Sequence, residues 1–277
     1  MSRTRTKRIA IAAFATLAAY GLIAYLLLPD FWKHYEHQKK LAPLPTVTVT
    51  AQGIPGDPLN IGLIGDERDI VCAMHEAGWF PADPVTLKTS IAIVGSVLLD
   101  RPYRDAPVSP LFYMGKKQQL AFEKPVGDSA DRREHLRLWQ VLERGDEGRP
   151  VWLGDATFDS GVGISHYTGA VTHHIAANVD QERERLTGDL DNARVVEAIY
   201  QVSGVGPTLN GRNGGGDRYY TDGDIWVSRL VPACKKRNAP AKVLPNSAII
   251  DLKNQVWKSI SALAGSDTPA KPLAGSR

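Results

Sequence analysis

The sequence predicts an α+β fold behind a single N-terminal transmembrane helix, and two observations carry this prediction. Residues 9–28 form an apolar run without a charged residue, and the chain after residue 58 passes from helical apolar spacing to apolar residues at every second position. One helix interrupts the strands, and no regular strand–helix alternation occurs. We therefore expect a mostly antiparallel sheet with a few helices rather than a doubly wound parallel sheet.

The apolar run reads IAIAAFATLAAYGLIAYLLL. A helix of about 20 residues covers about 30 Å, the thickness of the hydrocarbon core of a membrane. The basic segment 1–8 precedes it, and the first acidic residue is Asp30, so we expect a cytoplasmic N-terminus and an exported remainder in a bacterial inner membrane. A cleaved signal peptide is the alternative, but LLLPDFW offers no small-residue cleavage site.

The remainder divides into three predicted parts. Residues 29–57 should form a short juxtamembrane helix and then an extended linker, APLPTVTVTAQGIPGDP. Residues 58–232 should form the globular domain. Residues 233–277 should form a C-terminal extension whose end, SALAGSDTPAKPLAGSR, we expect to be disordered.

The first elements of the globular domain are a strand and two helices. NIGLIG at 60–65 predicts the strand, and GDERDIVCAMHEAGW at 65–79 predicts a helix that stops at Gly78. DPVTLKTSIAIVGSVLL at 83–99 predicts a second helix, with Asp83 as its cap and Pro84 in its first turn. A loop-rich stretch with little periodicity follows.

From residue 134 the period falls to two. The predicted strands are 134–141, 149–159 (between Gly148 and Gly161), 169–176, 193–204 and 223–230. DQERERLTGDL at 180–190 predicts a helix of about three turns. The glycine-rich segment 206–224 predicts a long hairpin-type connection with a mobile tip.

Several of these segments resemble one protein family. APVSPLFYMG, LAFEKP, HLRLWQV, GRPVWLGDATFD, and THHI followed by VDQERERL occur in this order, and over residues 58–203 the chain is similar to the LssY C-terminal domain family. The resemblance implies no reaction and no catalytic residues. It implies a setting, since such domains are often fused to membrane modules resembling lipid-phosphate phosphatases and small transporter-like domains of the bacterial envelope. This chain departs from that arrangement in having one anchor helix and no phosphatase module.

Adjacent histidines in VTHHI raise the question of a reactive or ligand-binding site. On a strand, neighbouring side chains point to opposite faces, so His173 should share an apolar face with Val171 and Ile175 while His174 shares a polar face with Thr172. In an irregular loop both rings could converge. A functional role and a purely structural role both remain open for this pair.

Alternation also gathers candidate residues on the two long strands. His135, Arg137 and Trp139 should share one face, where Arg137 either binds an anion beside the imidazole or packs on Trp139 by cation–π contact. Asp155 and Asp159 lie about 13 Å apart along one strand face and cannot share an ion. Asp159 could orient a histidine or ligate a metal, or it could stabilise a turn.

Other charged residues and the cysteines carry weaker signals. Lys124 could add positive charge to a pocket, and Arg183 could pair inward with an acid or extend its stem over apolar neighbours. In an oxidising compartment Cys72 and Cys234, the two cysteines of the chain, could form a disulfide. The sequence indicates neither a particular metal nor a cofactor.

Composition and motifs exclude several function classes. Four of the 33 basic residues precede residue 9, which leaves 29 against 30 acidic residues, without the basic excess typical of nucleic-acid binding. GxSxG, HExxH, CxxC and Walker motifs are absent from the sequence. Common hydrolase and NTPase templates therefore do not apply.

We expect a membrane-anchored envelope domain that binds an anionic ligand, such as a phosphorylated lipid or glycan. The candidate ligand-binding residues are Arg137, His135, His174, His173, Thr172 and Lys124. There are two alternatives. The first is a phosphoester hydrolase with His174, His135 and Asp159 as catalytic candidates, in which a histidine acts as general base. The second is a non-catalytic scaffold for a membrane assembly. Expected partners are membrane lipid and other envelope membrane proteins, and not nucleic acid.

Overall fold

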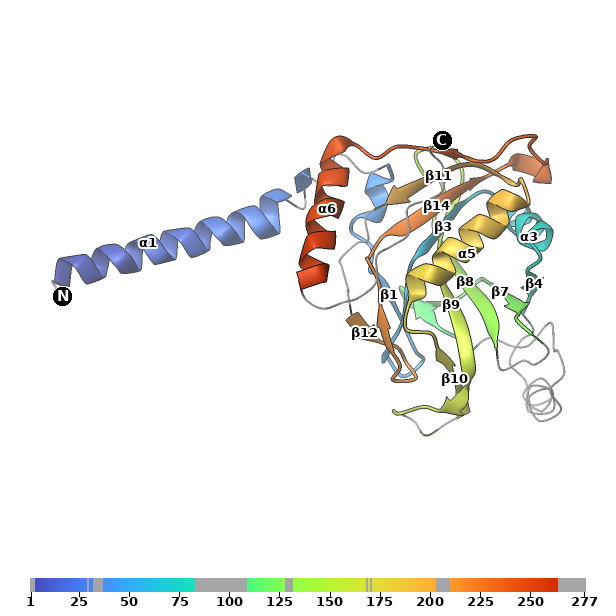
Figure 1. Cartoon of the computed structure of the whole chain (residues 1–277), viewed down its shortest axis with the longest axis horizontal. Coiled ribbons are helices and arrows are strands. Elements are labelled where there is room, and N and C mark those ends of the chain that lie inside the picture. The colour runs from blue at the N-terminus through green and yellow to red at the C-terminus, as the bar shows by residue number, and fades with distance from the viewer. Residues whose placement is uncertain are drawn as a thin grey trace.

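The computed structural model describes residues 3–28, 30–31, 37–82, 109–127, 132–167, 169, 171–202 and 210–263. The helix predicted at 83–99 lies outside these residues. Helix α1 (Arg3–Leu22) continues through a π-helical turn, Ile23–Leu27, and projects away from the rest of the chain (Figure 1). The span Thr4–Leu27 is long and apolar enough to cross a membrane, and none of its most apolar window is buried against the protein.

A nine-stranded sheet forms the centre of the domain and confirms the predicted α+β class. Its strand order is β15-β11-β14-β3-β9-β8-β7-β4, with β10 added to β9. Two pairings, β14 with β3 and β11 with β15, are parallel, and the others are antiparallel. The strands are β3 (Ile61–Ile64), β4 (Phe80–Pro81), β7 (Leu120–Pro125), β8 (Arg133–Leu142), β9 (Val151–Ile164), β10 (Val171–Ile175), β11 (Val196–Val202), β14 (Ile225–Leu230) and β15 (Lys242–Val243).

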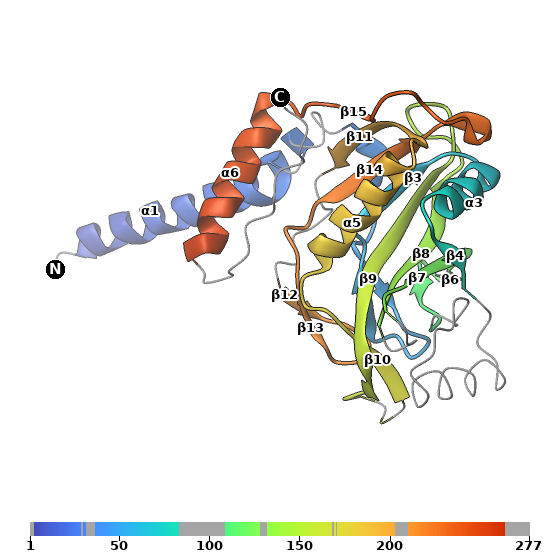
Figure 2. The same ribbon diagram turned by 45° about the vertical axis from the view of Figure 1, so that its right-hand side comes forward.

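Two helices cover one face of this sheet (Figures 1 and 2). Helix α3 (Glu67–Glu76) begins at Asp66 with a capping box and is followed by Gly78 at φ +81°, a stop as predicted. Helix α5 (Val179–Asn192) begins at Asn178, whose side chain accepts the amide of Gln181. Apolar residues of both helices and of alternate strand positions form the larger core, among them Ile70, Met74, Leu136, Leu138, Trp152, Leu186 and Leu190.

The other face of the sheet is divided into an apolar half and a polar half. Over the apolar half lies a small second sheet, whose strands are β1 (Val47–Val49), β2 (Pro55–Pro58), β5 (Phe112–Tyr113) and β6 (Lys116–Lys117). Tyr113 packs on Trp139 with ring centroids 6.0 Å apart, and Leu153 and Val227 join the same core. The polar half carries the residues of the candidate site.

Residues 42–58 differ from the extended linker predicted for them. They form β1 and β2, and Leu41 just before them is fully buried at the end of a short 3-10 turn (Lys39–Leu41). Proline and glycine suggested a linker, but the TVTVT alternation pairs with β5 through contacts distant in the sequence. In the predicted juxtamembrane helix, Asp30 and Phe31 are helical and residues 37–41 form turns, while residues 29 and 32–36 are outside the described residues.

The C-terminal extension is folded over residues 233–263, so the helix at its end includes residues 261–263 of the tail that was expected to be disordered. After a 3-10 turn (Pro232–Cys234), β15 adds to the edge of the sheet, and helix α6 (Ala248–Leu263) packs Ile250 inward. Cys72 on α3 forms a disulfide with Cys234, which settles the pairing that the sequence left open. Residues 264–277 lie outside the described part of the chain.

The two hairpins at the far end of the sheet carry the glycine-rich segments. Strands β12 (Asn210–Arg212) and β13 (Arg218–Tyr220) form the hairpin predicted at 206–224. Strand β9 does not end before Gly161 as predicted but runs to Ile164 and pairs with β10. The pairing shifts by one residue between Asp159 and Gly161, so Ser160 is the extra residue of a β-bulge.

Candidate functional site

The polar half of the sheet face gathers charged side chains away from water. Because side chains alternate between the two faces of a strand, those of β7, β8 and β9 in this cluster point to one side of the sheet. Strand β2 of the small sheet contributes one further side chain, that of Asp57. All are at most 4% exposed: Asp57, Glu123, Arg133, His135, Arg137, Asp155, Thr157 and Asp159. Such a concentration of buried ionisable groups is costly unless each is paired, and it is typical of a functional site or a structural ion-pair network.

His135 joins two of these residues through its two ring nitrogens. Its Nδ1 lies 3.0 Å from Asp159 Oδ1, and its Nε2 lies 2.5 Å from the Thr157 hydroxyl. Nη1 of Arg137, which can only donate, is also 3.0 Å from Nε2. Nε2 must therefore be the acceptor, which places the ring proton on Nδ1. Nδ1 is within ion-pair distance of Asp159 Oδ1, but the two groups are not aligned for a hydrogen bond.

The protonation states support this arrangement. Burial is the main cause that lowers the pKa of His135, and Arg137 lowers it further, while Asp159 acts in the opposite direction. For Asp159, burial alone would raise the pKa, but the charged guanidinium of Arg133 holds it below its ordinary value. Arg133 Nε donates to Asp159 Oδ2 at 2.9 Å. A neutral imidazole therefore lies between an ionised carboxylate and a hydroxyl.

Arg137 lies between two carboxyl groups. Its Nη1 is 3.1 Å from Asp57 and 3.1 Å from Asp155, and its Nε donates to the carbonyl of Ser109 at 2.9 Å. Burial raises the pKa of Asp155 to about 8, because Arg137 only partly opposes it and Asp57 adds to it. The guanidinium thus faces acids rather than the ring of Trp139, and the cation–π alternative is wrong.

The two adjacent histidines separate to opposite faces of β10, as predicted for a strand. His173 Nδ1 lies 4.0 Å from Asp159 Oδ2, and burial is the main cause that lowers the pKa of His173. His174 Nδ1 lies 2.6 Å from Asp217 on the other face, with its side chain 33% exposed. The His174 ring occupies the space over Gly163, and a Cβ added to Gly163 would lie 2.0 Å from His174 Nε2.

Two further predicted ligand-binding residues lie elsewhere. Lys124 Nζ contacts Asp189 at 2.6 Å and Glu134 at 3.8 Å, on the face covered by the helices. The Thr172 hydroxyl donates to the carbonyl of His173 at 3.4 Å. The structure therefore brings together His135, Arg137, Asp159 and His173, and it separates His174, Thr172 and Lys124 from them.

The site includes residues that sequence reasoning missed. Thr157 lies between Asp155 and Asp159 on the strand face predicted for these two aspartates, and Arg133 extends the His135 alternation by one step. Glu123 accepts from Arg133 Nη1 at 2.6 Å. Asp57 comes from the segment predicted as a linker, and nothing local in the sequence indicates its place.

A second buried ionic cluster has a structural character. Arg183 is fully buried and donates to both carboxylate oxygens of Asp222 at 2.7 and 2.9 Å. Its guanidinium lies 4.6 Å from the centroid of the Trp226 ring. The inward pairing that the sequence left open for Arg183 is thus confirmed.

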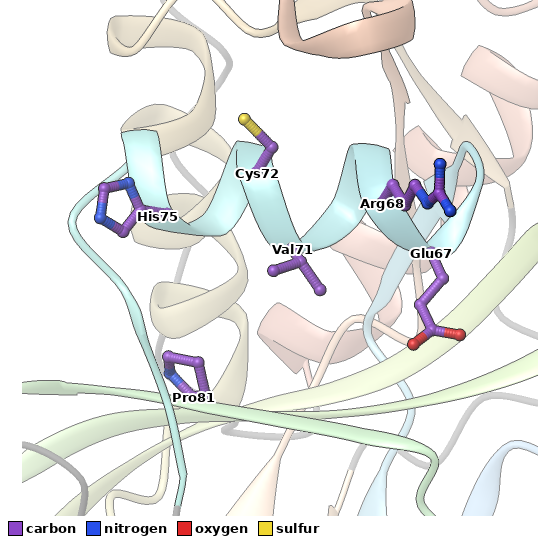
Figure 3. Close-up of a pocket in the computed structure, with 6 residues that line it drawn as sticks. All are labelled: Glu67, Arg68, Val71, Cys72, His75 and Pro81. Atoms are coloured by element: carbon purple, nitrogen blue, oxygen red, sulfur yellow. The ribbon is translucent and has the colours of Figure 1, made fainter.

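A hollow of about 440 Å³ lies along α3, away from these clusters, and Figure 3 shows the residues that line it. Its lining residues are Glu67, Arg68, Val71, Cys72, His75 and Pro81. Cys72 is held in the disulfide, so this hollow contains no free thiol. Within the described ranges no three His, Cys, Asp or Glu side chains form a group suited to a metal ion.

Residues 41–225 match the family model described as LssY C-terminus. Because the match covers more than half of the chain, the protein belongs to this family. No curated protein and no solved structure matches the chain.

Proposed function

We propose that this member of the LssY C-terminus family is an ester hydrolase in which Thr157 is the nucleophile, His135 the general base and Asp159 the residue that orients the base. One observation carries the proposal: the two nitrogens of a buried, neutral His135 lie 3.0 Å from Asp159 and 2.5 Å from the Thr157 hydroxyl. Nucleophile, base and orienting carboxylate in this order are the requirement for hydroxyl-based acyl transfer.

The geometry supports the following steps. Thr157 Oγ1 attacks the carbonyl carbon of the ester while His135 Nε2 accepts the hydroxyl proton, and the carbonyl electron pair moves to oxygen. The guanidinium of Arg137, whose Nη1 lies 3.0 Å from the same ring nitrogen, places a positive charge near that oxyanion. As the carbon–oxygen bond breaks, His135 returns the proton to the leaving alkoxide. Water then repeats the sequence on the acyl-threonine and releases the carboxylic acid.

The charge balance favours an uncharged carboxylic ester over an anionic phosphate ligand. Two guanidinium groups, Arg133 and Arg137, face four carboxyl groups within the cluster, Asp57, Glu123, Asp155 and Asp159. No surplus positive charge remains for a phosphate dianion. The expected anion site of Arg137, His135 and His174 would also need His174, which lies on the opposite face with Asp217.

Burial sets a requirement for this reaction. Thr157 is fully buried, and Arg137 is held to the carbonyl of Ser109. Substrate can reach the hydroxyl only if the chain around the site opens locally, and slow turnover is expected. A site closed to water also favours the intended reaction, because it strengthens the electrostatic interactions of its groups.

Hydrolysis of p-nitrophenyl butyrate and p-nitrophenyl phosphate by the full chain in detergent tests the proposal. We expect release from the butyrate ester alone. Thr157→Val, which keeps the shape but removes the hydroxyl, should reduce turnover by at least about 10³-fold. Thr187→Val, at another buried threonine on α5, is the matched control and should leave turnover unchanged.

A fluorophosphonate probe adds an independent readout. It should modify Thr157, as identified by peptide mass, and should fail to modify the Thr157→Val variant. Equal turnover in the two valine variants, or preference for the phosphate ester, would refute the assignment.

We further propose that the domain lies outside the cytosol. Helix α1 begins with four basic residues before its apolar span, and the Cys72–Cys234 disulfide is of the kind that persists in oxidising compartments. Alkaline phosphatase fused after Arg277 should be active in cells, whereas a green fluorescent protein fused at the same place should stay dark. The reverse pattern would place the domain in the cytosol.

A further inference from the structure

Helix α6 exposes apolar side chains on its outer face. Leu252 and Val256, one turn apart, are 57% and 51% exposed, respectively. Residues four apart on a helix lie on the same side. These two apolar side chains, beside the exposed Gln255 and Ser259, are not covered by the described part of the domain.

The opposite face of α6 fixes how the helix is rotated. Ile250 is buried, and the side-chain amides of Asn246 and Asn254 donate to Oε1 of Gln201 on β11 at 2.9 and 3.2 Å. These contacts hold the inward face against the sheet edge. Leu252 and Val256 are thereby directed away from the domain.

The segment that enters α6 is tied to the chain that leaves α1. His37 Nε2 lies 3.3 Å from the carbonyl of Pro245, and the ring of His37 packs on Tyr200 with centroids 4.8 Å apart. Both views show α6 at the end of the domain nearest α1, running across the direction of α1 (Figures 1 and 2). A helix across the direction of a membrane-spanning helix, at its exit, lies along the membrane surface.

We propose that α6 lies on the phospholipid bilayer next to α1, with Leu252 and Val256 inserted among the lipid chains. Amphipathic helices bind in this way, with the apolar side buried about 5–10 Å deep. The helix carries Asp251, Lys253 and Lys258, so its charges nearly cancel. Apolar insertion rather than attraction to anionic lipid therefore holds it, and together with α1 it fixes the orientation of the domain on the membrane.

The test uses the full chain in phosphatidylcholine vesicles with a nitroxide label. Because both native cysteines are in the disulfide, Val256→Cys provides a single reactive thiol. Met114→Cys is the control, since Met114 is 62% exposed and precedes β6, on the side of the domain away from α1 (Figure 2). Collision rates with oxygen, which concentrates in lipid, are compared with those of a water-soluble nickel chelate.

The ratio of oxygen to nickel collisions should be several-fold higher at 256 than at 114, and adding phosphatidylglycerol should leave it unchanged. Leu252→Cys should give the same result as Val256→Cys. Equal ratios at 256 and 114 would place this face in water and overturn the inference. Low collision rates with both reagents at 256 would show a protein contact, from a partner or a second copy of the chain, and would overturn it as well. Neither outcome bears on the hydrolase proposal, which has its own assay.

Discussion

His135 with Asp159 and His174 with Asp217 are two histidine–aspartate pairs with ring-nitrogen to carboxylate distances of 3.0 and 2.6 Å. Their surroundings differ. His135 is 3% exposed, and its second nitrogen contacts Thr157 and Arg137. The His174 side chain is 33% exposed, and its second nitrogen lies over the backbone of Gly163.

This difference shows that contact with an aspartate does not by itself make a histidine a base. An aspartate orients the imidazole ring. The chemical role of the ring depends on which group its other nitrogen contacts and on whether water is excluded from the site. His135 meets a hydroxyl in a closed site. His174 meets a glycine at the surface, where a charge pair contributes little. We therefore expect chemistry at the first pair and a modest structural role for the second.

The largest expected effect comes from the two aspartates. Asp159→Asn should lower the turnover number for p-nitrophenyl butyrate by about 10⁴-fold, because the amide no longer holds the ring in the tautomer with Nε2 free. Asp217→Asn should change turnover less than about twofold. Steady-state kinetics gives the turnover number of each variant, and circular dichroism confirms that both variants are folded. Equal losses would remove the distinction between the pairs.

A second effect concerns stability against pH at the buried site. The pKa of Asp155 is raised from 3.8 to about 8 in the folded chain. Between those values the unfolded chain has lost this proton and the folded chain keeps it, so stability falls as pH rises from about 4 to about 8. The total is on the order of 3 kcal/mol after allowance for relaxation.

Asp155→Asn carries no titrating group at this position and should make the pH dependence shallower, which urea unfolding at pH 5 and pH 8 measures. A residual slope is expected from Glu182 and Asp224, because burial raises their pKa values to about 9 and about 7. Asp217→Asn at the surface pair should leave the slope of the wild-type chain unchanged. A slope in Asp155→Asn equal to that of the wild-type chain would assign the whole titration to other groups.

A smaller effect is expected at the glycine beneath His174. Gly163→Ala would place a Cβ 2.0 Å from Nε2, so the ring must swing away from Asp217, at a cost of about 1 kcal/mol. Gly161→Ala is the matched control, since a Cβ there meets nothing within 4 Å. Urea unfolding compares the two. Ester hydrolysis should be unaffected in both, and a loss in Gly163→Ala would link the surface pair to the reaction.

The smallest effect should come from His174→Gln. A partly exposed pair contributes less than about 1 kcal/mol to stability, and turnover should remain at the wild-type level. His135→Gln, the same change at the buried pair, should abolish measurable turnover. Thermal unfolding and the butyrate assay on both variants provide the comparison, and inactivity of His174→Gln would contradict it.

Much of the fold could be predicted because local patterns specify it. Period-two alternation placed His135 and Arg137 on one face, and it identified Asp159 as able to orient a histidine. The assignment of His173 and His174 to opposite faces followed from the strand alone. Which of the two meets Asp159 did not follow, because the bulge at Ser160 decides the register.

The features that could not be predicted depend on contacts distant in the sequence. Asp57 reaches Arg137 only because β2 joins the small sheet, and Lys124 is drawn to Asp189 on α5. Helix α6 was not predicted because one part of its apolar surface packs on the domain while another is exposed. Its apolar residues therefore do not follow one clear stripe.

The extra residue in β9 absorbs a difference of one residue in length between the two strands of its hairpin with β10. Asp159 pairs with Ile175 and Gly161 pairs with His174, so Ser160 is already left out of the ladder. Loss of the single codon for Ser160 would therefore restore an unbroken ladder with the same partners. His173 would still face Asp159 and His174 would still face away from it, whereas the loss of one residue from an unbulged strand turns its outer part over.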